Sequence, residues 1–289
     1  MYNYEIFTES TADLTQELVD QLGVQVIPME FTLDGKNYFN YPDNRQLSPK
    51  EFYDGLRNGG KSTTAQVNSE RMKDAFRPVL SEGKDLLYLV FSSGLSGTWQ
   101  SAQLALEDLK EEFPQRNIRF VNTLNASMGE GLMVWYAAKM REKGDSLDQV
   151  ADYMEKNWES FNSWFTVDDL MFLKRGGRLS GGAAIAGTLL GIKPVLHVDQ
   201  EGHLINMEKV RGRKTSLDSL ARHYREHGLD KENNVVFISH GDCLEDAKYL
   251  EQQVRQAGAK EVYLGTIGPV IGAHSGPGTV ALFFWGDGR

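Results

Sequence analysis

The sequence predicts an α/β protein made of two α/β domains, with a largely parallel sheet in the first domain and a mixed sheet in the second. Apolar runs of strand length alternate with longer amphipathic segments, which is typical of strand–helix–strand units. Two hairpin signals interrupt this alternation, and hairpins join antiparallel strands. A polar helical segment ends near Ser160, so we expect one domain over residues 1–160 and a second over residues 161–289.

The expected strands are short apolar runs, and the expected helices carry apolar residues at three- and four-residue spacing. The strands cover residues 4–8, 86–91, 118–122, 235–239, 262–267 and 280–285. The helices cover residues 15–22, 49–56, 68–80, 98–109, 128–143 and 244–256.

Each hairpin is indicated by a turn signal between two apolar runs. Residues 26–39 turn at Asp34-Gly35, a pair that favours a tight two-residue connection. Residues 194–206 turn near Glu201-Gly202. Residues 164–172, just after the domain boundary, are strand-like, and a glycine-rich stretch over residues 176–191 follows them.

Composition and charge narrow the functional classes. The 289-residue chain has a net charge of −9, which argues against a nucleic-acid partner, because such proteins carry a basic surface. A single cysteine, Cys243, permits no internal disulfide. The N-terminus lacks the pattern of a signal peptide. A long stretch without Asp, Glu, Lys or Arg, residues 265–286, contains six glycines and two prolines, so we expect no transmembrane segment and a cytoplasmic location.

Residues 268–279 form the most unusual stretch of the chain, with four glycines, two prolines and one histidine. Glycine lets a backbone or a ligand approach closely, and proline restricts the bends. We interpret this stretch as a shaped loop that holds a small polar group. His274 is its one side chain that can titrate or donate a hydrogen bond near neutral pH.

Residues 92–102 place serines and glycines between a predicted strand and a predicted helix, a position where free backbone N–H groups bind anions. Ser93, Ser96 and Gly97 are the candidate contacts. Helix capping by Ser96 is the plainer alternative, but it explains one serine and not the cluster. A nucleophilic pair of Ser93 or Ser96 with His274 stays open, although the G-x-S-x-G elbow is absent and no acid is evident to orient His274.

Three further motifs match known sites, but their context is wrong. Residues 55–62 fit a phosphate-binding loop, yet they follow a helix and lead into an extended segment. Residues 276–281 fit a dinucleotide fingerprint, yet a strand follows where a helix is needed. His223 and His227 fit an H-x-x-E-H zinc motif, but no nearby segment offers an obvious third ligand. We therefore expect no nucleotide cofactor and no metal.

Six motifs, taken together, resemble the DegV family of bacterial fatty-acid-binding proteins over nearly the whole chain. They are TESTADL at 8–14, TTAQ at 63–66, SSGLSGT at 92–98, LKRGGRLS at 173–180, LGIKP at 190–194 and IGPVIGAHSGPG at 267–278. The chain departs from the family pattern at Glu9, where aspartate is usual, and at Ala65 and Val67. The basic turn at 172–180 is, on its own residues, equally well a solvated surface cluster or an anion or partner contact.

The resemblance implies two α/β domains with a long-chain fatty acid bound between or within them, and no other cofactor. It implies that Thr64 and Ser93 hold the carboxylate, with Ser96, Gly97 and His274 close by. Residues 183–192 are apolar enough to line the acyl tunnel.

Some family members are the lipid-presenting subunit of a fatty-acid kinase, in which a separate ATP-dependent subunit forms the acyl phosphate. In that role Arg178, Arg211 and Arg213 would face the partner, and the chain alone would not be an enzyme. A Ser–His acyl hydrolase or phosphotransferase on the same fold, and a protein whose pocket is vestigial, are the alternatives.

Overall fold

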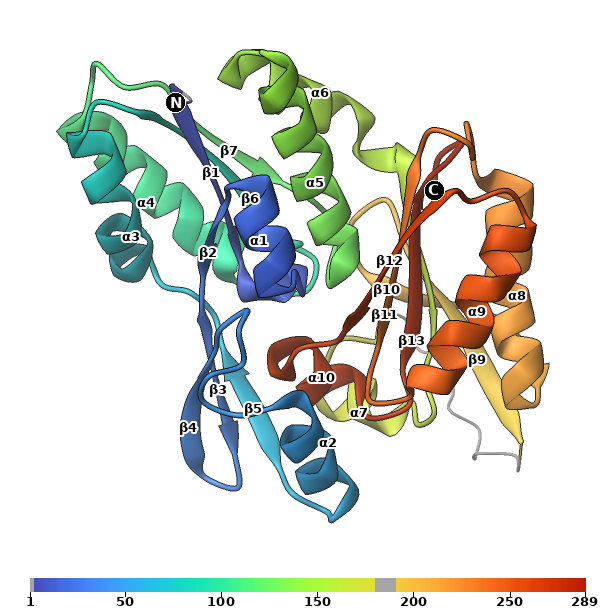
Figure 1. Cartoon of the computed structure of the whole chain (residues 1–289). Coiled ribbons are helices and arrows are strands. Elements are labelled where there is room, and N and C mark those ends of the chain that lie inside the picture. Colours follow the sequence, from blue (N-terminus) through green and yellow to red (C-terminus); the bar gives the residue numbers. More distant parts are fainter. Residues whose placement is uncertain (1–2, 180–190) are drawn as a thin grey trace.

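The computed structural model describes residues 3–179 and 191–289, and in them the chain forms a four-stranded, a three-stranded and a six-stranded sheet (Figure 1). The four-stranded and the six-stranded sheets lie side by side with one helix between them. The three-stranded sheet extends from the four-stranded one. The α/β fold, with one fully parallel and one mixed sheet, confirms the predicted fold class.

The four-stranded sheet is parallel throughout, in the order β2-β1-β6-β7. Its strands are β1 (Tyr4–Glu9), β2 (Gln25–Ile27), β6 (Asp85–Val90) and β7 (Ile118–Asn122). Apolar side chains alternate between the two faces of β6 and enter different cores, because successive residues of a strand point to opposite sides. The helices α3 (Ser69–Ser81) and α4 (Thr98–Glu112) cover one face, whereas α1 (Gln16–Leu22), α5 (Met128–Lys143) and α6 (Leu147–Asn157) cover the other.

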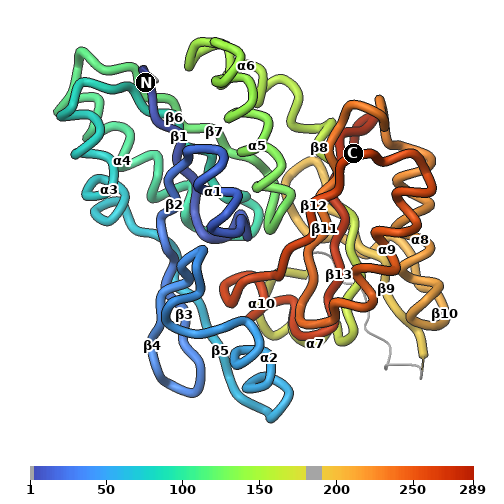
Figure 2. The backbone as a smooth tube through the Cα atoms, in the orientation of Figure 1, coloured from blue at the N-terminus to red at the C-terminus, as the bar shows by residue number. Residues whose placement is uncertain are grey.

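The small sheet contains the first predicted hairpin. Its antiparallel order is β4-β3-β5, with β3 (Met29–Leu33), β4 (Lys36–Asn40) and β5 (Ser62–Ala65), and α2 (Pro49–Arg57) connects β4 to β5. Asp34 and Gly35 adopt φ values of 50° and 79° at the turn, the left-handed pair that a tight hairpin needs. This sheet projects away from the parallel sheet and carries β5 toward the C-terminal half (Figure 2).

The six-stranded sheet is mixed, in the order β10-β9-β8-β13-β11-β12, and among its described strands only the β11–β12 pair is parallel. Its strands are β8 (Phe161–Thr166), β9 (Ile192–Val198), β10 (Leu204–Arg211), β11 (Val235–His240), β12 (Glu261–Thr266) and β13 (Val280–Trp285). The helices α8 (Arg213–His227) and α9 (Leu244–Gln256) cover its outer face (Figure 1). The second predicted hairpin is β9–β10.

Helix α5 lies between the parallel sheet and the six-stranded sheet and packs on both. Leu132 of α5 shares one hydrophobic core with Phe237 and Phe283 of the six-stranded sheet. A helix that is buried on several sides needs no single apolar face. The sequence of α5 therefore predicts a helix but does not indicate which sheets pack against it. Every strand of the six-stranded sheet begins at or after Phe161, which agrees with a domain boundary near residue 160. The shared hydrophobic core, however, joins the two halves of the chain. The domain boundary at residue 160 therefore stays a prediction.

Two segments differ from the prediction. Residues 164–172 are not one strand, because β8 ends at Thr166 and a short helix, α7 (Met171–Arg175), follows. Residues 268–279 are not an open loop, because α10 (Pro269–Ser275) occupies their first half, with Pro269 at its first position. Proline suits the first turn of a helix, where its missing N–H is not needed. No helix in the described ranges has the length and apolar character that a membrane span requires.

Candidate functional site

A cavity of about 210 Å³ lies where the parallel sheet, the six-stranded sheet and α10 meet. It is many times larger than the roughly 10–15 Å³ that a single water needs. Apolar side chains from both halves of the chain line most of its wall, among them Phe91, Leu95, Phe165, Val198, Ile271, Ala281 and Phe283. A cavity with such a wall suits an elongated apolar ligand better than a polar one.

Thr64 and His274 meet at one end of this cavity. The Thr64 Oγ1 atom lies 2.8 Å from His274 Nε2, so strand β5 and helix α10 are joined there by a hydrogen bond. Burial, and to a smaller degree the charge of Arg178, lower the pKa of His274 to about 4. The imidazole is therefore neutral at pH 7 and keeps one N–H donor. Its Nδ1 atom is buried and has no hydrogen-bond partner.

Close packing positions the His274 ring. A Cβ atom at Gly176 would collide with the imidazole, so only glycine lets the backbone after α7 pass this close. The N-terminus of α10 is held by Asp13, whose Oδ1 accepts the Gly268 N–H at 2.9 Å and whose Oδ2 accepts the Ser127 hydroxyl at 2.6 Å. These contacts anchor the helix that carries His274 to the N-terminal half of the chain.

Arg178 also lies at this polar end. It lines the cavity with Thr64 and His274, and its Nε donates to the Leu95 carbonyl at 3.1 Å while Nη1 donates to the Gly176 carbonyl. Burial lowers the pKa of Arg178, although the group remains cationic at neutral pH. The resemblance implied that Arg178 faces a partner. In the structure Arg178 is half-buried and lies beside the candidate carboxylate site.

The N-terminus of α4 contributes Ser96 and Gly97 to the same wall. Gly97, not Ser96, occupies the cap position of α4, so the expectation that Ser96 caps the helix is wrong by one residue. The Ser96 hydroxyl still accepts the Thr98 N–H at 3.2 Å. Gln66, which the sequence analysis did not single out as a contact, lies against Gly97, and a Cβ atom at position 97 would collide with its side chain.

Ser93 is not among the residues that line the cavity. Its hydroxyl accepts a hydrogen bond from Asn122 Nδ2 at 2.7 Å, and its backbone N–H donates to Asn122 Oδ1 at 3.2 Å. The side chain is therefore engaged with the end of β7. No carboxylate in the described part of the chain bonds to His274, so the third member of a nucleophilic triad is missing there.

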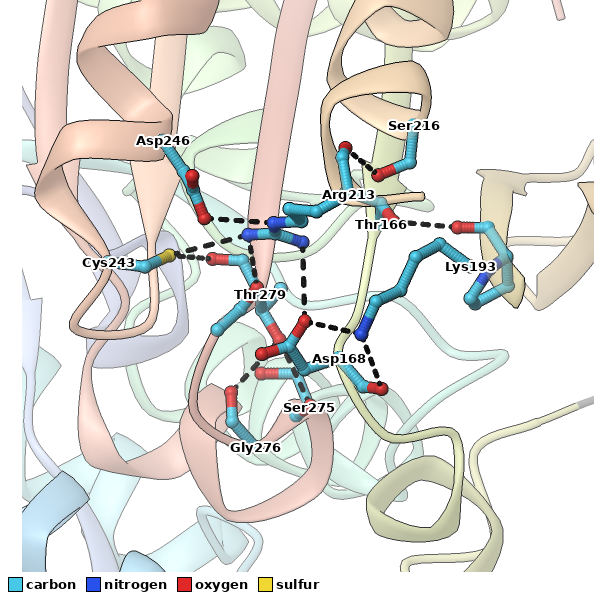
Figure 3. Close-up of polar contacts among 12 residues, drawn as sticks. Thr166, Asp168, Lys193, Arg213, Ser216, Cys243, Asp246, Ser275, Gly276 and Thr279 are labelled. Carbon is cyan, nitrogen blue, oxygen red and sulfur yellow. Dashed lines mark hydrogen bonds and ion pairs between the residues drawn. The ribbon is translucent and has the colours of Figure 1, made fainter. Parts of the chain in front are cut away.

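Arg213 belongs to an internal polar network (Figure 3). At the start of α8, its Nε donates to Asp246 at 2.8 Å and its Nη2 donates to the Gly278 carbonyl at 2.6 Å. Asp168 lies 3.9 Å from the same guanidinium and 2.8 Å from Lys193 Nζ. Arg213 thus fixes the position of the backbone at Gly278, just after α10. Arg211, at the end of β10, is exposed.

Cys243 lies beside this network and donates to the Thr279 carbonyl (Figure 3). Burial raises the pKa of its thiol to about 12, so the thiolate that a nucleophile requires is absent at neutral pH. Cys243 is therefore an inert thiol in this environment.

A groove adjoins the polar end of the cavity. Thr64, Arg178 and His274 line both the cavity and this groove, and Lys61 and Arg175 add positive charge to it. The polar end is therefore reached from the interior through apolar walls and from outside past basic side chains.

The phosphate-loop pattern at residues 55–62 spans the end of α2 and the start of β5. Its Lys61 N–H donates to Asp34 Oδ1 at 2.9 Å, so the backbone closes on the hairpin and not on a nucleotide. A strand, β13, follows residues 276–279 as expected, which confirms that the dinucleotide pattern lacks its helix. The predicted tunnel residues 183–190 lie outside the described residues, and Ile192 is exposed at the start of β9.

Comparison with known proteins places this architecture in one family. A family model described as "Uncharacterised protein, DegV family" matches residues 3–287. A DegV domain-containing protein from Clostridium perfringens is 42% identical over 288 residues, which are 99% of each chain. A fatty-acid-binding DegV family protein from Thermus thermophilus superposes with a TM-score of 0.88 at 34% identity, over 99% of this chain and 100% of that one. A fatty acid binding DegV family protein from Streptococcus agalactiae gives 0.85 at 31% identity, over 98% of each.

Proposed function

This chain belongs to the DegV family, and from that premise we propose that it binds a long-chain fatty acid in the cavity between its two larger sheets. The observation that carries the proposal is an apolar cavity with one polar end, where Thr64 and His274 meet. The similar structures from Thermus thermophilus and Streptococcus agalactiae are described as fatty-acid-binding, which supports the same ligand class here.

The two parts of a fatty acid suit the two parts of the cavity. Burial of about fifteen methylenes at ~0.8 kcal/mol each supplies roughly 12 kcal/mol before the cost of ordering the ligand is subtracted. A carboxylate only accepts hydrogen bonds. The Thr64–His274 pair keeps one donor for the carboxylate, because its other hydrogen lies in the bond between the two side chains. Arg178 supplies positive charge, and the Gly97 N–H lies at a helix N-terminus.

The two candidate serines differ in how directly their hydroxyls can reach the proposed carboxylate site. Ser96 lines the cavity and can donate directly. Ser93 would take part only after its hydroxyl leaves Asn122, to which it is bonded at 2.7 Å.

We infer further that the protein presents the carboxylate to a separate ATP-dependent kinase subunit for acyl-phosphate formation, as a non-catalytic cytoplasmic protein. Lys61 and Arg175 flank the outer side of the polar end, and their positive charge suits an approaching phosphate donor. In this role Arg178 would act at the carboxylate and exposed Arg211 would contact the partner. Arg213 would act by holding the backbone at Gly278.

Mass spectrometry of an organic extract from gently purified protein tests the ligand class first. We expect about one long-chain fatty acid per chain. An empty extract, followed by a titration in which palmitate does not bind, would overturn the proposal.

Incubation with ATP, Mg²⁺ and palmitate separates a binding subunit from an enzyme. We expect no acyl phosphate unless a kinase subunit is added, and robust product from this chain alone would contradict the presenting role. Ester hydrolysis that is lost in Ser96→Ala, with the lipid still bound, would favour the hydrolase.

A further inference from the structure

A cluster of histidine and glutamate side chains lies on α8, which covers the outer face of the six-stranded sheet (Figure 1). His223, Glu226 and His227 each offer one ligand atom, and these atoms lie within 4.8 Å of one another. In the sequence this motif lacks an obvious third ligand from a nearby segment. The helix supplies it itself, because positions i, i+3 and i+4 share one face.

A carboxylate from another element contacts each imidazole of the cluster. His223 Nε2 lies 2.5 Å from Glu208 Oε1 of β10, and His227 Nδ1 lies 3.1 Å from Asp287 Oδ1, after β13. Arg222 Nη2 also lies 3.3 Å from His223 Nε2, but the Glu208 carboxylate is much closer at 2.5 Å. The ring nitrogen that donates to a carboxylate carries the proton in a neutral imidazole. The lone pairs therefore reside on His223 Nδ1 and His227 Nε2. Such outer carboxylates are the usual support of metal-binding histidines.

The available nitrogen of His223 has no other role in the described structure. The His223 side chain is only 9% exposed, and its Nδ1 atom is buried without a hydrogen-bond partner. Leaving such an atom unpaired is unfavourable. The ring is stacked on Trp164 with centroids 3.4 Å apart and planes within 10°, so its orientation is restricted before any ligand arrives.

We propose that this cluster is a zinc site with His223 Nδ1, His227 Nε2 and a Glu226 oxygen as ligands and water in the fourth position. Two imidazoles, one carboxylate and an open position are a set that Zn²⁺ accepts with tetrahedral geometry. The ligand atoms would close to about 3.4 Å, the separation that bonds of roughly 2.1 Å impose.

The bound ion would connect α8 indirectly to β10 and to the segment after β13, through the carboxylates of Glu208 and Asp287. Its main competitor is Arg222, which pairs with Glu226 at 3.0 Å and also with Glu208. The Glu226 and Arg222 side chains are 50% and 38% exposed, and exposed ion pairs contribute little to stability. Glu226 can therefore exchange this partner for the metal without disturbing the fold.

The test is a zinc titration of the metal-free full-length protein against a chromophoric chelator, with the melting temperature as a second readout. We expect one saturable site per chain and a zinc-dependent rise in melting temperature. His227→Gln and Glu226→Gln, both at partly exposed positions, should weaken binding at least tenfold. Asp287→Asn, which removes only the outer carboxylate, should weaken it by about tenfold.

His203→Gln is the matched control. His203 is 36% exposed and lies 3.8 Å from Asp199 and 3.5 Å from Glu201, so it resembles His227 but lies outside the cluster. This variant should bind zinc as tightly as the wild type. The absence of saturable binding in the wild type, or equal affinity in His227→Gln, would overturn the proposal. Co²⁺ in place of zinc should give the absorption of a tetrahedral nitrogen–oxygen site, and an octahedral spectrum would contradict the assigned geometry.

Discussion

Replacement of Thr64 by valine should weaken fatty-acid binding without loss of the fold. Valine keeps the shape of the side chain and favours β-strands, and β5 is an edge strand that pairs only with β3 among the described strands. The change removes the hydroxyl that lies 2.8 Å from His274 Nε2. A hydrogen bond to a charged group contributes about 1.5–3 kcal/mol, so the Kd for palmitate should rise by roughly 10- to 150-fold.

Competition titrations with palmitate and with the alcohol of the same chain length would measure this effect. The alcohol shares the acyl chain but has no carboxylate, so its affinity should change much less. Thr63→Val is the control, because Thr63 is exposed and bonds to Thr32 at 2.8 Å instead of facing the cavity. If Thr64→Val binds palmitate as tightly as the wild type and still prefers it over the alcohol, the assignment of Thr64 is wrong.

Three further outcomes are expected. Ala281→Phe places a ring into the cavity wall, and the fatty acid in the organic extract should fall at least tenfold while the circular dichroism spectrum is retained. Leu132→Ala on the buried helix α5 should lower the free energy of unfolding by about 2–5 kcal/mol, measured in urea. Burial raises the pKa of Glu9 from 4.5 to about 7, so the folded state retains a proton that the unfolded state releases, and this stabilisation is lost as the pH rises through that window. Glu9→Gln should therefore become more stable relative to the wild type as the pH rises from 5 to 8, and urea unfolding at both pH values would show whether the difference stays constant instead.

Burial is the main cause of the raised Glu9 pKa, and Glu9 lies in a buried group of acids at the end of β1. Glu9 accepts hydrogen bonds from the Tyr88 hydroxyl, the Phe91 N–H and Thr11. The Thr11 hydroxyl is also 3.2 Å from Glu130, and burial raises the pKa of Glu130 well above its usual value. Two carboxyl groups so close together in a buried site favour at least one bound proton at neutral pH.

Most regular elements could be predicted from local patterns. The helices at 128–143 and 244–256 and the strand at 118–122 have the predicted bounds. The helix at 244–256 keeps one apolar face along its length, whereas α5 is buried on several sides and keeps no such face. The segment 164–172 was mistaken for a strand because its apolar residues belong to two elements. Trp164 faces the hydrophobic core under α8. Phe172 belongs to the short helix α7 and packs against the hydrophobic core that contains residues of α3 and α4.

The candidate site, like the fold, could be predicted only in part from the sequence. Thr64, Ser96, Gly97 and His274 were selected from motifs in three separate segments, and the structure brings them to one cavity. Their roles stay predictions. Gln66 and the apolar residues of β13 gave no separate signal, because a residue that lines a cavity has the same composition as one that packs in a core.

The sequence alone determined most of the helices and strands and which residue types could hold a carboxylate, because these properties depend on neighbours within one or two turns of the chain. Tertiary structure alone decided that α5 lies between two sheets, that Thr64 meets His274 across 210 positions, and that Ser93 turns to Asn122. The same holds for the carboxylates that face His223 and His227 from β10 and from the chain after β13. Such contacts join segments far apart in the chain, and local periodicity contains no information about which distant segment will be the neighbour.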